Sequence, residues 1–561
     1  MEQILKKSWP QNLPETLTYK FGEKPLREYL KQNAIDHPNR IAYHFYGNQI
    51  SWSQLNDSTC RLAQFLTDKG VKKGERVALY MQNCPQYIIG YFAIQQLGAI
   101  VVPLNPMYKG AELEYFINEV GIKAVMCSQE LYHNLHAIQE QIPIVEFIIT
   151  TNYADFLSKD ISLPLPEELK IKKEKIRNTN DLQEILETYP PLNESTEINV
   201  WEDIGLMSFT SGTTGRPKAA MLTFGNALFK AAAVSHTFGY TEDDRTIIIP
   251  PLCHIGGKMV GICVPIYSAC ESVLMTRFDP EATISAIEKY KTNLLYTLAP
   301  MNAAILNHPG IEERNLTSLE VNFATSFGIQ VSEKLANEWK RITEGCLMLE
   351  ATYGLSETHD ADTFMPKNKV KYGSCGIPTY DTEIRILDLE SGENLPPRKQ
   401  GEIVIKSPGV FKGYFKRDKE THETLRDGWL HTGDIGWIDN EGYLYISGRI
   451  KEMIKCSGYS VFPEDVEALL ERHEAISQVA VIGVADEKRG ESVKAFIVLK
   501  PEYRGKLTES DMIEWSKKNM AAYKYPRHIE FRDSLPIAIS GKVLRKSLKE
   551  EESEEVTKIV N

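Results

Sequence analysis

The sequence lacks any uninterrupted apolar run of about 20 residues, the length that a membrane-spanning helix requires. It also lacks the apolar core of a signal peptide near its N-terminus. Its 9 cysteines are scattered and form no C-x-x-C pair, a pattern that excludes a conventional disulfide framework or zinc site. We therefore expect a cytoplasmic protein with reduced thiols and no transmembrane segment.

The chain also has no excess of basic residues. Its formal net charge is −12, from 64 basic and 76 acidic residues, which argues against nucleic acid as the main partner. Hydrophobic residues at 42% and charged residues at 25% are typical of a globular protein. At 561 residues the chain exceeds the usual size of one domain, so two or more domains are expected.

The order of strand and helix patterns predicts an α/β fold. Residues 40–104 and about 204–330 each alternate strand and helix signals, which indicates two α/β subdomains with parallel sheets. From about residue 375 the pattern changes to short strands with turns, typical of a small β-rich subdomain. The segment after Arg449 resembles a compact α+β domain. The polar, proline-bearing segment 153–200 is interpreted as a surface excursion outside the core.

Residues 210–223 read "TSGTTGRPKAAMLT", a stretch rich in Gly, Ser and Thr. It is not a Walker loop, because Arg216 and Pro217 separate Gly215 from Lys218. A flexible linker is the simpler interpretation of such a cluster. The apolar, helix-forming continuation favours instead a phosphate-binding loop that leads into an ordered element.

Four further segments make the phosphate interpretation specific. They are "ATYGLSET" (351–358), "DGWLHTGDIGWID" (427–439), "GRIKEMIKCSGYSVFPEDVE" (448–467) and "PIAISGKVLRK" (536–546). The second segment carries Asp434 between two glycines, where we expect a turn. Five such segments in this order are hard to obtain by chance.

With these motifs the chain resembles the adenylate-forming superfamily, which includes acyl-CoA synthetases, plant aryl-acid CoA ligases, firefly luciferase and peptide-synthetase adenylation domains. The resemblance covers about residues 25–546. It implies that a carboxylate attacks the α-phosphate of ATP, with Mg²⁺, to give an acyl-adenylate and pyrophosphate. The thiol of coenzyme A then displaces AMP and gives a thioester.

The resemblance also implies the residues that contact ATP. They are Thr210, Ser211, Gly212, Thr213, Thr214, Gly215, Lys218, Ser326, Gly328, Tyr353, Gly354, Ser356, Asp434 and Arg449. By resemblance, the loop and Lys218 hold the β- and γ-phosphates, Glu357 holds Mg²⁺, and Tyr353 packs on adenine. Asp434 and Arg449 correspond to the ribose contacts.

Further residues take part in the two half-reactions by resemblance. Lys542 corresponds to the catalytic lysine between the carboxylate and the α-phosphate, and His254 to an aromatic gate between the ATP and acyl sites. A mobile C-terminal domain, residues 450–561 after an N-terminal domain of residues 1–449, rotates about Lys451. Gly458 then lets coenzyme A pass close to the backbone.

Two clusters favour structural interpretations. In residues 357–362, His359, Asp360 and Asp362 resemble a metal cluster, but their alternation in sequence sends them to opposite faces. Cys253 and His254 invite a nucleophile–base interpretation. Adjacent residues of an extended segment point in opposite directions, which argues against a catalytic dyad.

The acyl substrate is the least specific part of the prediction. No acidic residue lies in "PPLCHIGG" to pair with a substrate ammonium, so amino acids are disfavoured. We expect no carrier domain after Lys542, which favours free coenzyme A over an attached thiol as the acceptor. Residues 225–263 and 323–331 are rich in apolar side chains, and we expect them to line a pocket for a medium- or long-chain fatty acid. Phe327 stands where the family usually has a glycine and could narrow this pocket.

Several alternatives stay open. An aromatic acid of the coumarate or succinylbenzoate kind is one, and an acyl-AMP ligase or a luciferase-like oxidase is another. A regulatory ATP-binding protein is disfavoured by the joint presence of Glu357, Asp434, Arg449 and Lys542. Peripheral membrane contact and a homodimer also stay open, although no basic amphipathic helix is apparent.

Overall fold

A computed structural model describes residues 8–161, 163–194, 196–210, 217–326, 330–456, 459–486, 489–537 and 543–560. By their contacts the residues divide into two compact units. The first unit comprises Met1–Thr325, Val331–Glu383 and Ile405–Leu430. The second comprises Ser326–Gln330, Ile384–Val404 and His431–Asn561. The chain therefore passes between the units more than once.

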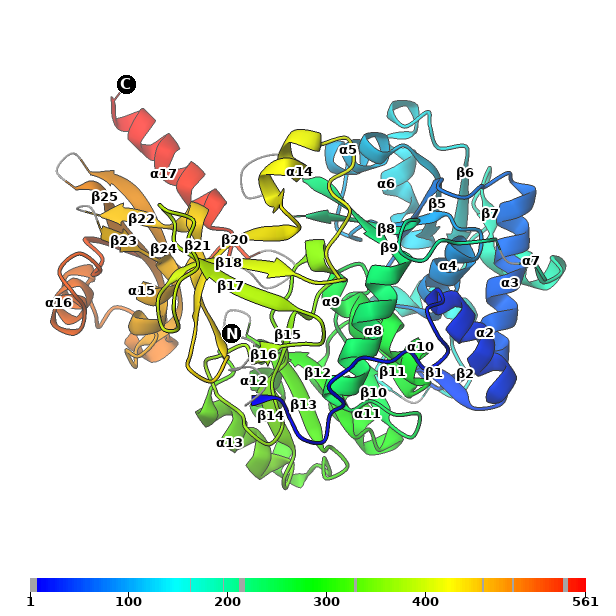
Figure 1. Cartoon of the computed structure of the whole chain (residues 1–561), viewed down its shortest axis with the longest axis horizontal. Helices are drawn as coiled ribbons and strands as arrows, with labels where there is room; N and C mark the ends of the chain where they lie inside the picture. The colour runs from blue at the N-terminus through cyan, green and yellow to red at the C-terminus, as the bar shows by residue number, and fades with distance from the viewer. Residues whose placement is uncertain are drawn as a thin grey trace. The chain divides into compact units, whose positions relative to one another are not determined.

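The first unit contains two seven-stranded sheets, most of whose strands are labelled in Figure 1. One sheet has the order β7 (Asn180–Asp181), β6 (Phe147–Thr151), β5 (Ile122–Ser128), β3 (Arg76–Tyr80), β4 (Ile100–Pro103), β8 (Ile204–Thr210), β9 (Lys218–Thr223). Its neighbours are parallel except for the antiparallel pair β8–β9. The inner strands β3 and β4 are almost wholly buried, as expected of a sheet covered on both faces.

The second sheet is also parallel apart from one hairpin at its edge. Its order is β14 (Leu347–Glu350), β13 (Val321–Thr325), β12 (Leu294–Leu298), β10 (Arg245–Ile248), β11 (Glu271–Leu274), β1 (Ile41–Phe45), β2 (Asn48–Ser51). The β1–β2 hairpin turns at Tyr46–Gly47, both with positive φ. The two α/β subdomains predicted from the alternating pattern are confirmed.

Helices connect and cover these strands. They are α2 (Leu26–Asp36), α3 (Trp52–Asp68), α4 (Pro85–Gln96), α5 (Ala111–Val120), α6 (Tyr132–His136), α7 (Leu182–Thr188), α8 (Phe224–Phe238), α9 (Ile255–Lys258), α10 (Val264–Ser268), α11 (Pro280–Tyr290), α12 (Ala299–Leu306), α13 (Glu333–Ile342) and α14 (Asp418–Thr424). Ser51 and Thr223 begin α3 and α8 through capping boxes, in which a side-chain oxygen accepts a backbone N–H. The predicted helix after "TSGTTG" thus begins only at Phe224, because residues 218–223 pair with β8 as a strand.

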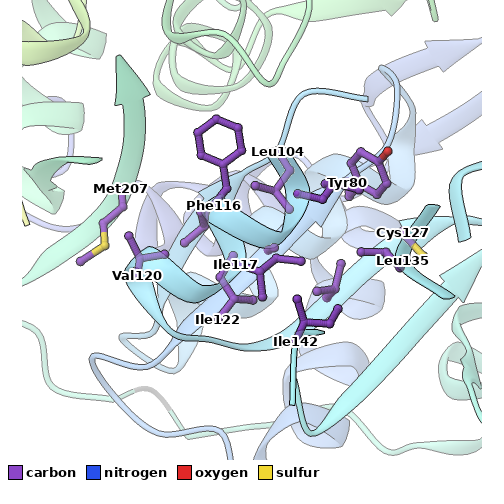
Figure 2. Packing of buried hydrophobic residues seen from close by; sticks show 14 of the residues in the cluster. Tyr80, Leu104, Phe116, Ile117, Val120, Ile122, Cys127, Leu135, Ile142 and Met207 are labelled. Carbon is purple, nitrogen blue, oxygen red and sulfur yellow. The ribbon is translucent and has the colours of Figure 1, made fainter. Parts of the chain in front are cut away.

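One hydrophobic core lies under α5. The helix buries Leu113, Phe116, Ile117 and Val120 against the strands of the first sheet, as Figure 2 shows for part of the cluster. These positions recur every three or four residues, the spacing of one helix face. The core fixes the strand ends from which the loops extend.

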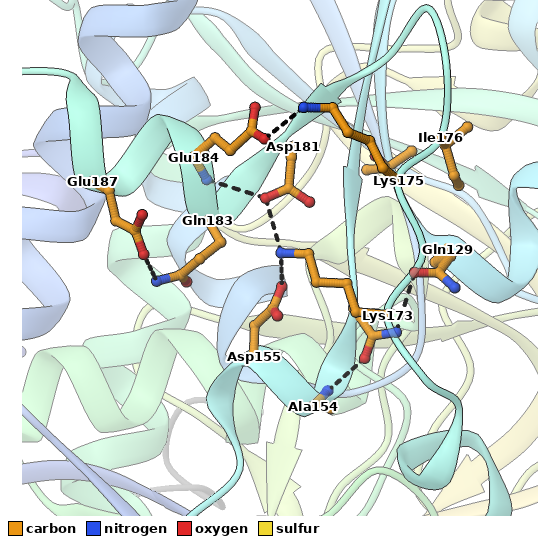
Figure 3. A network of polar contacts seen from close by, with 12 residues as sticks. Gln129, Ala154, Asp155, Lys173, Lys175, Ile176, Asp181, Gln183, Glu184 and Glu187 are labelled. Atoms are coloured by element: carbon orange, nitrogen blue, oxygen red, sulfur yellow. Dashed lines mark hydrogen bonds and ion pairs between the residues drawn. The ribbon is translucent and has the colours of Figure 1, made fainter.

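The segment 153–200 is more than a surface excursion, because part of it packs into the first unit. Leu182 and Ile185 of α7 are buried, and β7 extends the first sheet. Lys173 joins Asp155 and Asp181 at 2.9 and 3.0 Å, and Lys175 reaches Glu184 at 3.0 Å (Figure 3). The polar composition reflects this ion-pair network, while a few leucines and isoleucines anchor the segment.

The rest of the chain forms a β-rich region and an α+β region, and most of their residues belong to the second unit. A five-stranded sheet has the order β17 (Glu383–Leu387), β18 (Gly401–Lys406), β20 (Trp429–Ile438), β19 (Leu425–Arg426), with β21 (Leu444–Arg449) also paired to β20. Another has the order β23 (Tyr459–Val461), β22 (Ile454–Cys456), β25 (Gly490–Leu499), β24 (Ile476–Asp486), with β26 (His528–Phe531) paired to β25. Its helices are α15 (Pro463–Leu470), α16 (Glu509–Asn519) and α17 (Arg545–Val560). The predicted fold class is confirmed.

No helix in the described part of the chain is long and apolar enough to cross a bilayer. The longest, α3 and α17, carry 17 and 16 residues.

A buried ion pair ties α8 to the loop that follows β14. Lys230 Nζ lies 2.7 Å from Asp362 Oδ1 and donates to the carbonyl of Ala361 at 2.9 Å, and both side chains are fully buried. Thr358 donates its hydroxyl to the other Asp362 oxygen. Burial raises the pKa of Asp362, while Lys230 counteracts the shift. The pair therefore compensates two charges that neither element could bury alone.

We expect Lys230→Met to destabilise the first unit by about 3–5 kcal/mol, because it leaves the Asp362 carboxylate buried without its cation. The double variant Lys230→Met/Asp362→Leu should recover most of this loss, since neither charge then remains. Denaturant titrations of the three proteins would check both statements. Equal destabilisation of the single and double variants would contradict them.

Candidate active site

Lys218 lies at the start of β9, directly across from Thr210 at the end of β8. Antiparallel pairing thus fixes both ends of the hydroxyl-rich loop. The loop residues predicted to bind phosphate, namely Ser211, Gly212, Thr213, Thr214 and Gly215, fall outside the described residues, as do Gly328, Gly458 and Lys542.

Tyr414 joins the loop strand to the predicted magnesium ligand. Lys218 Nζ lies 4.0 Å from the centre of the Tyr414 ring, and the Tyr414 hydroxyl donates to Glu357 Oε1 at 2.7 Å. Tyr414 itself is buried, whereas Lys218 and Glu357 are half-buried. A cation and a carboxylate are therefore held on one aromatic side chain, and both remain accessible to a ligand.

Backbone contacts make this arrangement rigid. Ala220 and Tyr414 form a β-bridge, and the Met221 N–H donates to the Gly413 carbonyl at 2.9 Å. The Phe411 N–H donates to the Glu357 carbonyl at 2.8 Å. Sequence analysis did not single out Tyr414, because its partners lie far away along the chain and no local pattern marks it.

Tyr353 and Gly354 lie between β14 and a 3-10 turn, Ser356–Thr358, that contains Ser356 and Glu357. Tyr353 is only 8% exposed, and its N–H donates to the Thr363 hydroxyl at 2.8 Å. A Cβ on Gly354 would lie 2.3 Å from the backbone nitrogen of Ala361, so only glycine fits. The returning chain forces this contact through three consecutive left-handed residues, His359, Asp360 and Ala361.

The six-residue stretch 357–362 does not gather its polar side chains in one place. Asp362 is held by Lys230 and Thr358, as described above. The Asp360 carboxylate instead lies beside Gly354 and Gly256. The two ring nitrogens of His359 are buried without a hydrogen-bond partner, and burial lowers the pKa of this imidazole to about 3.

His254 immediately precedes α9 and is exposed. Close packing around the imidazole, followed by the charge of Lys258, lowers its pKa, so the ring is neutral at physiological pH. Burial raises the pKa of the neighbouring Cys253 thiol to about 11. Such a thiol is a poor nucleophile, which agrees with the prediction that the two residues form no catalytic dyad.

Lys258 is a fully buried cation one turn after His254. Its Nζ makes one marginal hydrogen bond, 3.5 Å to the Cys253 carbonyl, and no ion pair with a carboxylate among the described residues. Burial lowers its pKa from 10.5 to about 8. A stretch of π-helix, Met259–Cys263, follows directly, and such rare distortions concentrate at functional sites.

Asp434 and Arg449 form an ion pair in the second unit. They are cross-strand partners on β20 and β21, and Arg449 Nε lies 2.7 Å from Asp434 Oδ1. Asp434 is 5% exposed, and its N–H donates to the Thr432 hydroxyl at 3.0 Å. The predicted turn at Asp434 is wrong: the flanking glycines lie within a strand, where Gly433 has positive φ and pairing with β21 continues.

The predicted hinge residue Lys451 is exposed and lies in a 3-10 turn, Ile450–Glu452.

Arg545, at the start of α17, binds the end of this turn through Glu452. It also donates to Glu464 at 2.7 Å and to both oxygens of Glu467 at 3.1 and 2.6 Å. Burial, together with the charges of Glu467 and Glu452, raises the pKa of Glu464 to about 7, against the lowering effect of Arg545. Sequence analysis missed Arg545, whose partners lie far away along the chain.

The predicted site residues thus fall into two groups. The first unit carries Thr210, Lys218, His254, Tyr353, Gly354, Ser356 and Glu357, and the second carries Ser326, Asp434, Arg449 and Lys451. Direct contacts join Lys218 and Glu357 through Tyr414 in one group, and Asp434 to Arg449 in the other.

Comparison with known proteins defines the family. Residues 30–415 match the model of the AMP-binding enzyme, and residues 465–542 match the AMP-binding enzyme C-terminal domain. The chain belongs to the AMP-binding enzyme family, which confirms the resemblance predicted from its motifs.

Similar proteins are acid–CoA ligases matched over nearly their whole length. A long-chain-fatty-acid–CoA ligase of Bacillus subtilis is 34% identical, covering 97% of each chain. A feruloyl-CoA synthase of an Amycolatopsis species is 30% identical, covering 91% of this chain and 95% of the other. Among solved structures, O-succinylbenzoate coenzyme A synthetase of Bacillus subtilis in complex with AMP is similar with a TM-score of 0.77 and 27% identity, covering 94% and 98%.

We expect Lys258→Met to stabilise the protein at pH 7 by about 3 kcal/mol, because a fall in pKa from 10.5 to about 8 measures the cost of burying the charge. A lowered lysine pKa penalises the fold fully below pH 8, and the penalty disappears as pH rises toward 10.5. The advantage of the variant should therefore shrink over that window. Denaturant titrations at several pH values, with the exposed Lys334→Met as control, would test this, and a destabilised Lys258→Met at pH 7 would contradict it.

Proposed function

We propose that the chain is an ATP-dependent acid–CoA ligase that acts through an acyl-adenylate. The observation that carries the proposal is the contact of Tyr414 with both Lys218 and Glu357, beside the ends of the hydroxyl-rich loop. This arrangement presents a cation for phosphate oxygens and a carboxylate for a metal ion. Family membership and whole-length similarity to acid–CoA ligases support it.

In the first step a carboxylate oxygen of the acid attacks the α-phosphorus of ATP, and the bond to the β-phosphate breaks to release pyrophosphate. In the second step the sulfur of coenzyme A attacks the acyl carbon, the bond to AMP breaks, and the thiol proton is released. Converting the carboxylate to a mixed anhydride supplies the leaving group that the free acid lacks.

The residues of the first unit fit the polyphosphate. Lys218 and the hydroxyl-rich loop, residues 210–215, would hold the β- and γ-phosphates. Glu357 would bind Mg²⁺, which prefers oxygen ligands, and the hydrogen bond from Tyr414 orients its carboxylate for this purpose. Mg²⁺, when bound, offsets the negative charge of the phosphates.

A further group of residues would hold the nucleoside. Tyr353, Gly354, Ser356, Ser326 and Gly328 would contact adenine and the adjoining phosphate. Asp434 would accept hydrogen bonds from the ribose hydroxyls. Arg449 orients that buried carboxylate through its 2.7 Å contact.

The change between the half-reactions would involve the C-terminal segment. We place the boundary between residues 449 and 450, with rotation about Lys451, which lies in an exposed turn that can absorb a dihedral change. Lys542 would stabilise charge during adenylation. Gly458 would admit the pantetheine arm of coenzyme A in the second step, and a neutral His254 would separate the acyl and nucleotide sites.

A medium- or long-chain fatty acid is the leading substrate class, and an aromatic acid is the second candidate. The extensive burial of apolar residues in α8 and in the following 259–264 segment favours an apolar acyl group. Each methylene that such a pocket buries contributes about 0.8 kcal/mol. The 30% identity to a feruloyl-CoA synthase favours the aromatic alternative. The scattered free cysteines support a cytoplasmic location.

The proposal is tested by incubating the protein with ATP, Mg²⁺ and a panel of palmitate, decanoate, ferulate and O-succinylbenzoate, with and without coenzyme A. We expect pyrophosphate release with at least one acid, and mass spectrometry should detect its CoA thioester only when coenzyme A is present. Accumulation of acyl-AMP without thioester would instead indicate an acyl-AMP ligase. Absence of pyrophosphate release with every acid would contradict the proposal.

The role of Tyr414 gives a second test. Tyr414→Phe keeps the ring under Lys218 but removes the hydrogen bond to Glu357, so adenylation should fall by roughly 10-fold, as expected for a hydrogen bond to a charged group. Tyr414→Leu also removes the ring beneath Lys218, so its adenylation rate should fall further. Steady-state pyrophosphate release at several Mg²⁺ concentrations would measure both effects, and Lys412→Met, which alters only an exposed ion pair with Glu202, serves as control. An unchanged rate in Tyr414→Leu would show that the contact is dispensable.

A further inference from the structure

Asp360 is a buried carboxylate that no side-chain donor satisfies in the described part of the chain. It is 8% exposed, and no side-chain hydrogen bond or ion pair reaches it among the described residues. The neighbouring Asp362 shows what a structural carboxylate requires in this loop, because a lysine and a threonine hydroxyl satisfy it. Burial raises the pKa of Asp360 to about 6, although the Ala361 N–H and Lys230 lower it.

Leaving such a group without a strong partner is costly. A buried polar group without full hydrogen bonding costs roughly 1–3 kcal/mol, and more when it is charged. Asp360 also has a left-handed backbone, with φ of 69°, which asparagine and aspartate tolerate better than most residues. A neutral asparagine side chain could accept the Ala361 N–H equally well. The local structure therefore does not explain why this position carries a carboxylate.

The carboxylate lies at a place that a substrate can reach. Its Oδ1 is 2.7 Å from the position of a Cβ on Gly354, and its Oδ2 is 3.2 Å from the corresponding position on Gly256. Both glycines are partly exposed, and the Asp360 carboxylate packs directly against them with no side chain between. Gly354 belongs to the proposed nucleotide segment, and Gly256 follows the proposed gate His254.

A pair of hydroxyl groups, from Tyr296 and Thr325, lies near Gly256 and Asp360. The Tyr296 hydroxyl lies 4.0 Å from the same Gly256 Cβ position and shares a 2.9 Å hydrogen bond with Thr325. Thr325 is the last residue of β13, and Tyr296 lies in the middle of the parallel strand β12, so the hydroxyl pair lies toward the carboxyl end of the sheet. Ligands of open α/β sheets bind at such ends.

The charges nearby favour a neutral donor over an ammonium. Lys230, which already pairs with Asp362, is the cation that acts on Asp360, and the unpaired Lys258 lies in the same short helix as Gly256. Adding a third buried cation here would increase repulsion. A hydroxyl group donates one hydrogen bond and carries no charge, so it can satisfy the Asp360 carboxylate without adding to the positive charge nearby.

We propose that Asp360 is a specificity-determining residue that accepts a hydrogen bond from a hydroxyl group on the acyl substrate. The preferred acid is then hydroxylated, rather than a bare hydrocarbon chain or ring. This inference rests on the proposed acid–CoA ligase function and narrows its substrate class.

Two matched pairs of acids test the inference and distinguish the source of the hydroxyl. Palmitate is compared with ω-hydroxypalmitate, and cinnamate with para-hydroxycinnamate, by kcat/KM for CoA thioester formation. The wild-type protein should prefer the hydroxylated member of at least one pair by about 10-fold or more, the value of a hydrogen bond to a charged acceptor. Asp360→Ala should abolish this preference while the rate with the unsubstituted acid changes by less than about 3-fold.

Asp360→Asn tolerates the left-handed backbone and serves if the alanine variant unfolds. It should reduce the preference, because it replaces a carboxylate by a weaker neutral acceptor. Asp381→Ala is the matched control, since Asp381 is also left-handed but exposed. That control should keep the wild-type preference.

Thioester formation without any preference for a hydroxylated acid would overturn the inference and leave the proposed function intact. A preference that survives in Asp360→Asn and Asp360→Ala would overturn it as well. Failure of the wild-type protein to form a thioester from any of the four acids, or from those of the wider panel, would count against the proposed function itself.

Discussion

The hydrogen bond from Tyr414 to Glu357 is the contact on which the proposed phosphate site depends. It links a side chain from the 411–415 segment to the turn after β14, while the same ring lies beneath Lys218 at the start of β9. Three segments distant in sequence thereby become one assembly. Because Tyr414 is buried and its backbone is bridged to β9, the cation and the carboxylate keep a fixed separation without a bound ligand. Such preorganisation is what electrostatic stabilisation of a developing phosphate charge requires.

Buried charge divides the neighbouring loop into structural and chemical parts. Lys230 and Asp362 neutralise each other and hold α8 against the loop. Lys258 and Asp360 are also buried, but no side chain among the described residues compensates them in this way. Natural proteins seldom retain uncompensated polar groups in their interior unless those groups have a task. The contrast between Asp362 and Asp360 therefore separates a carboxylate that holds the loop in place from one that is available to a ligand.

The sequence predicted the layer architecture well because strand and helix periodicities are local. The alternation in residues 40–104 indicated each element from β1 to β4, and the capping box at Ser51 agrees with the helix that follows it. Failures occurred where tertiary pairing overrides local signals. The glycines around Asp434 suggested a turn, but pairing with β21 makes the segment a strand. Tyr414 and Arg545 were missed because their partners, Glu357 and the glutamates of residues 452–467, are brought close only by folding. The family motifs identified Lys218 and Glu357, yet gave no indication of the side chain that joins them.

The central claim is that the acid becomes covalently joined to AMP, and isotope transfer tests it most directly. The protein would be incubated with ATP, Mg²⁺, coenzyme A and a carboxylic acid labelled with oxygen-18 in its carboxyl group, and the products would be weighed by mass spectrometry. Attack of the carboxylate on the α-phosphorus predicts that each AMP carries one labelled oxygen from the acid. Unlabelled AMP, or label found in inorganic phosphate together with ADP, would contradict the account.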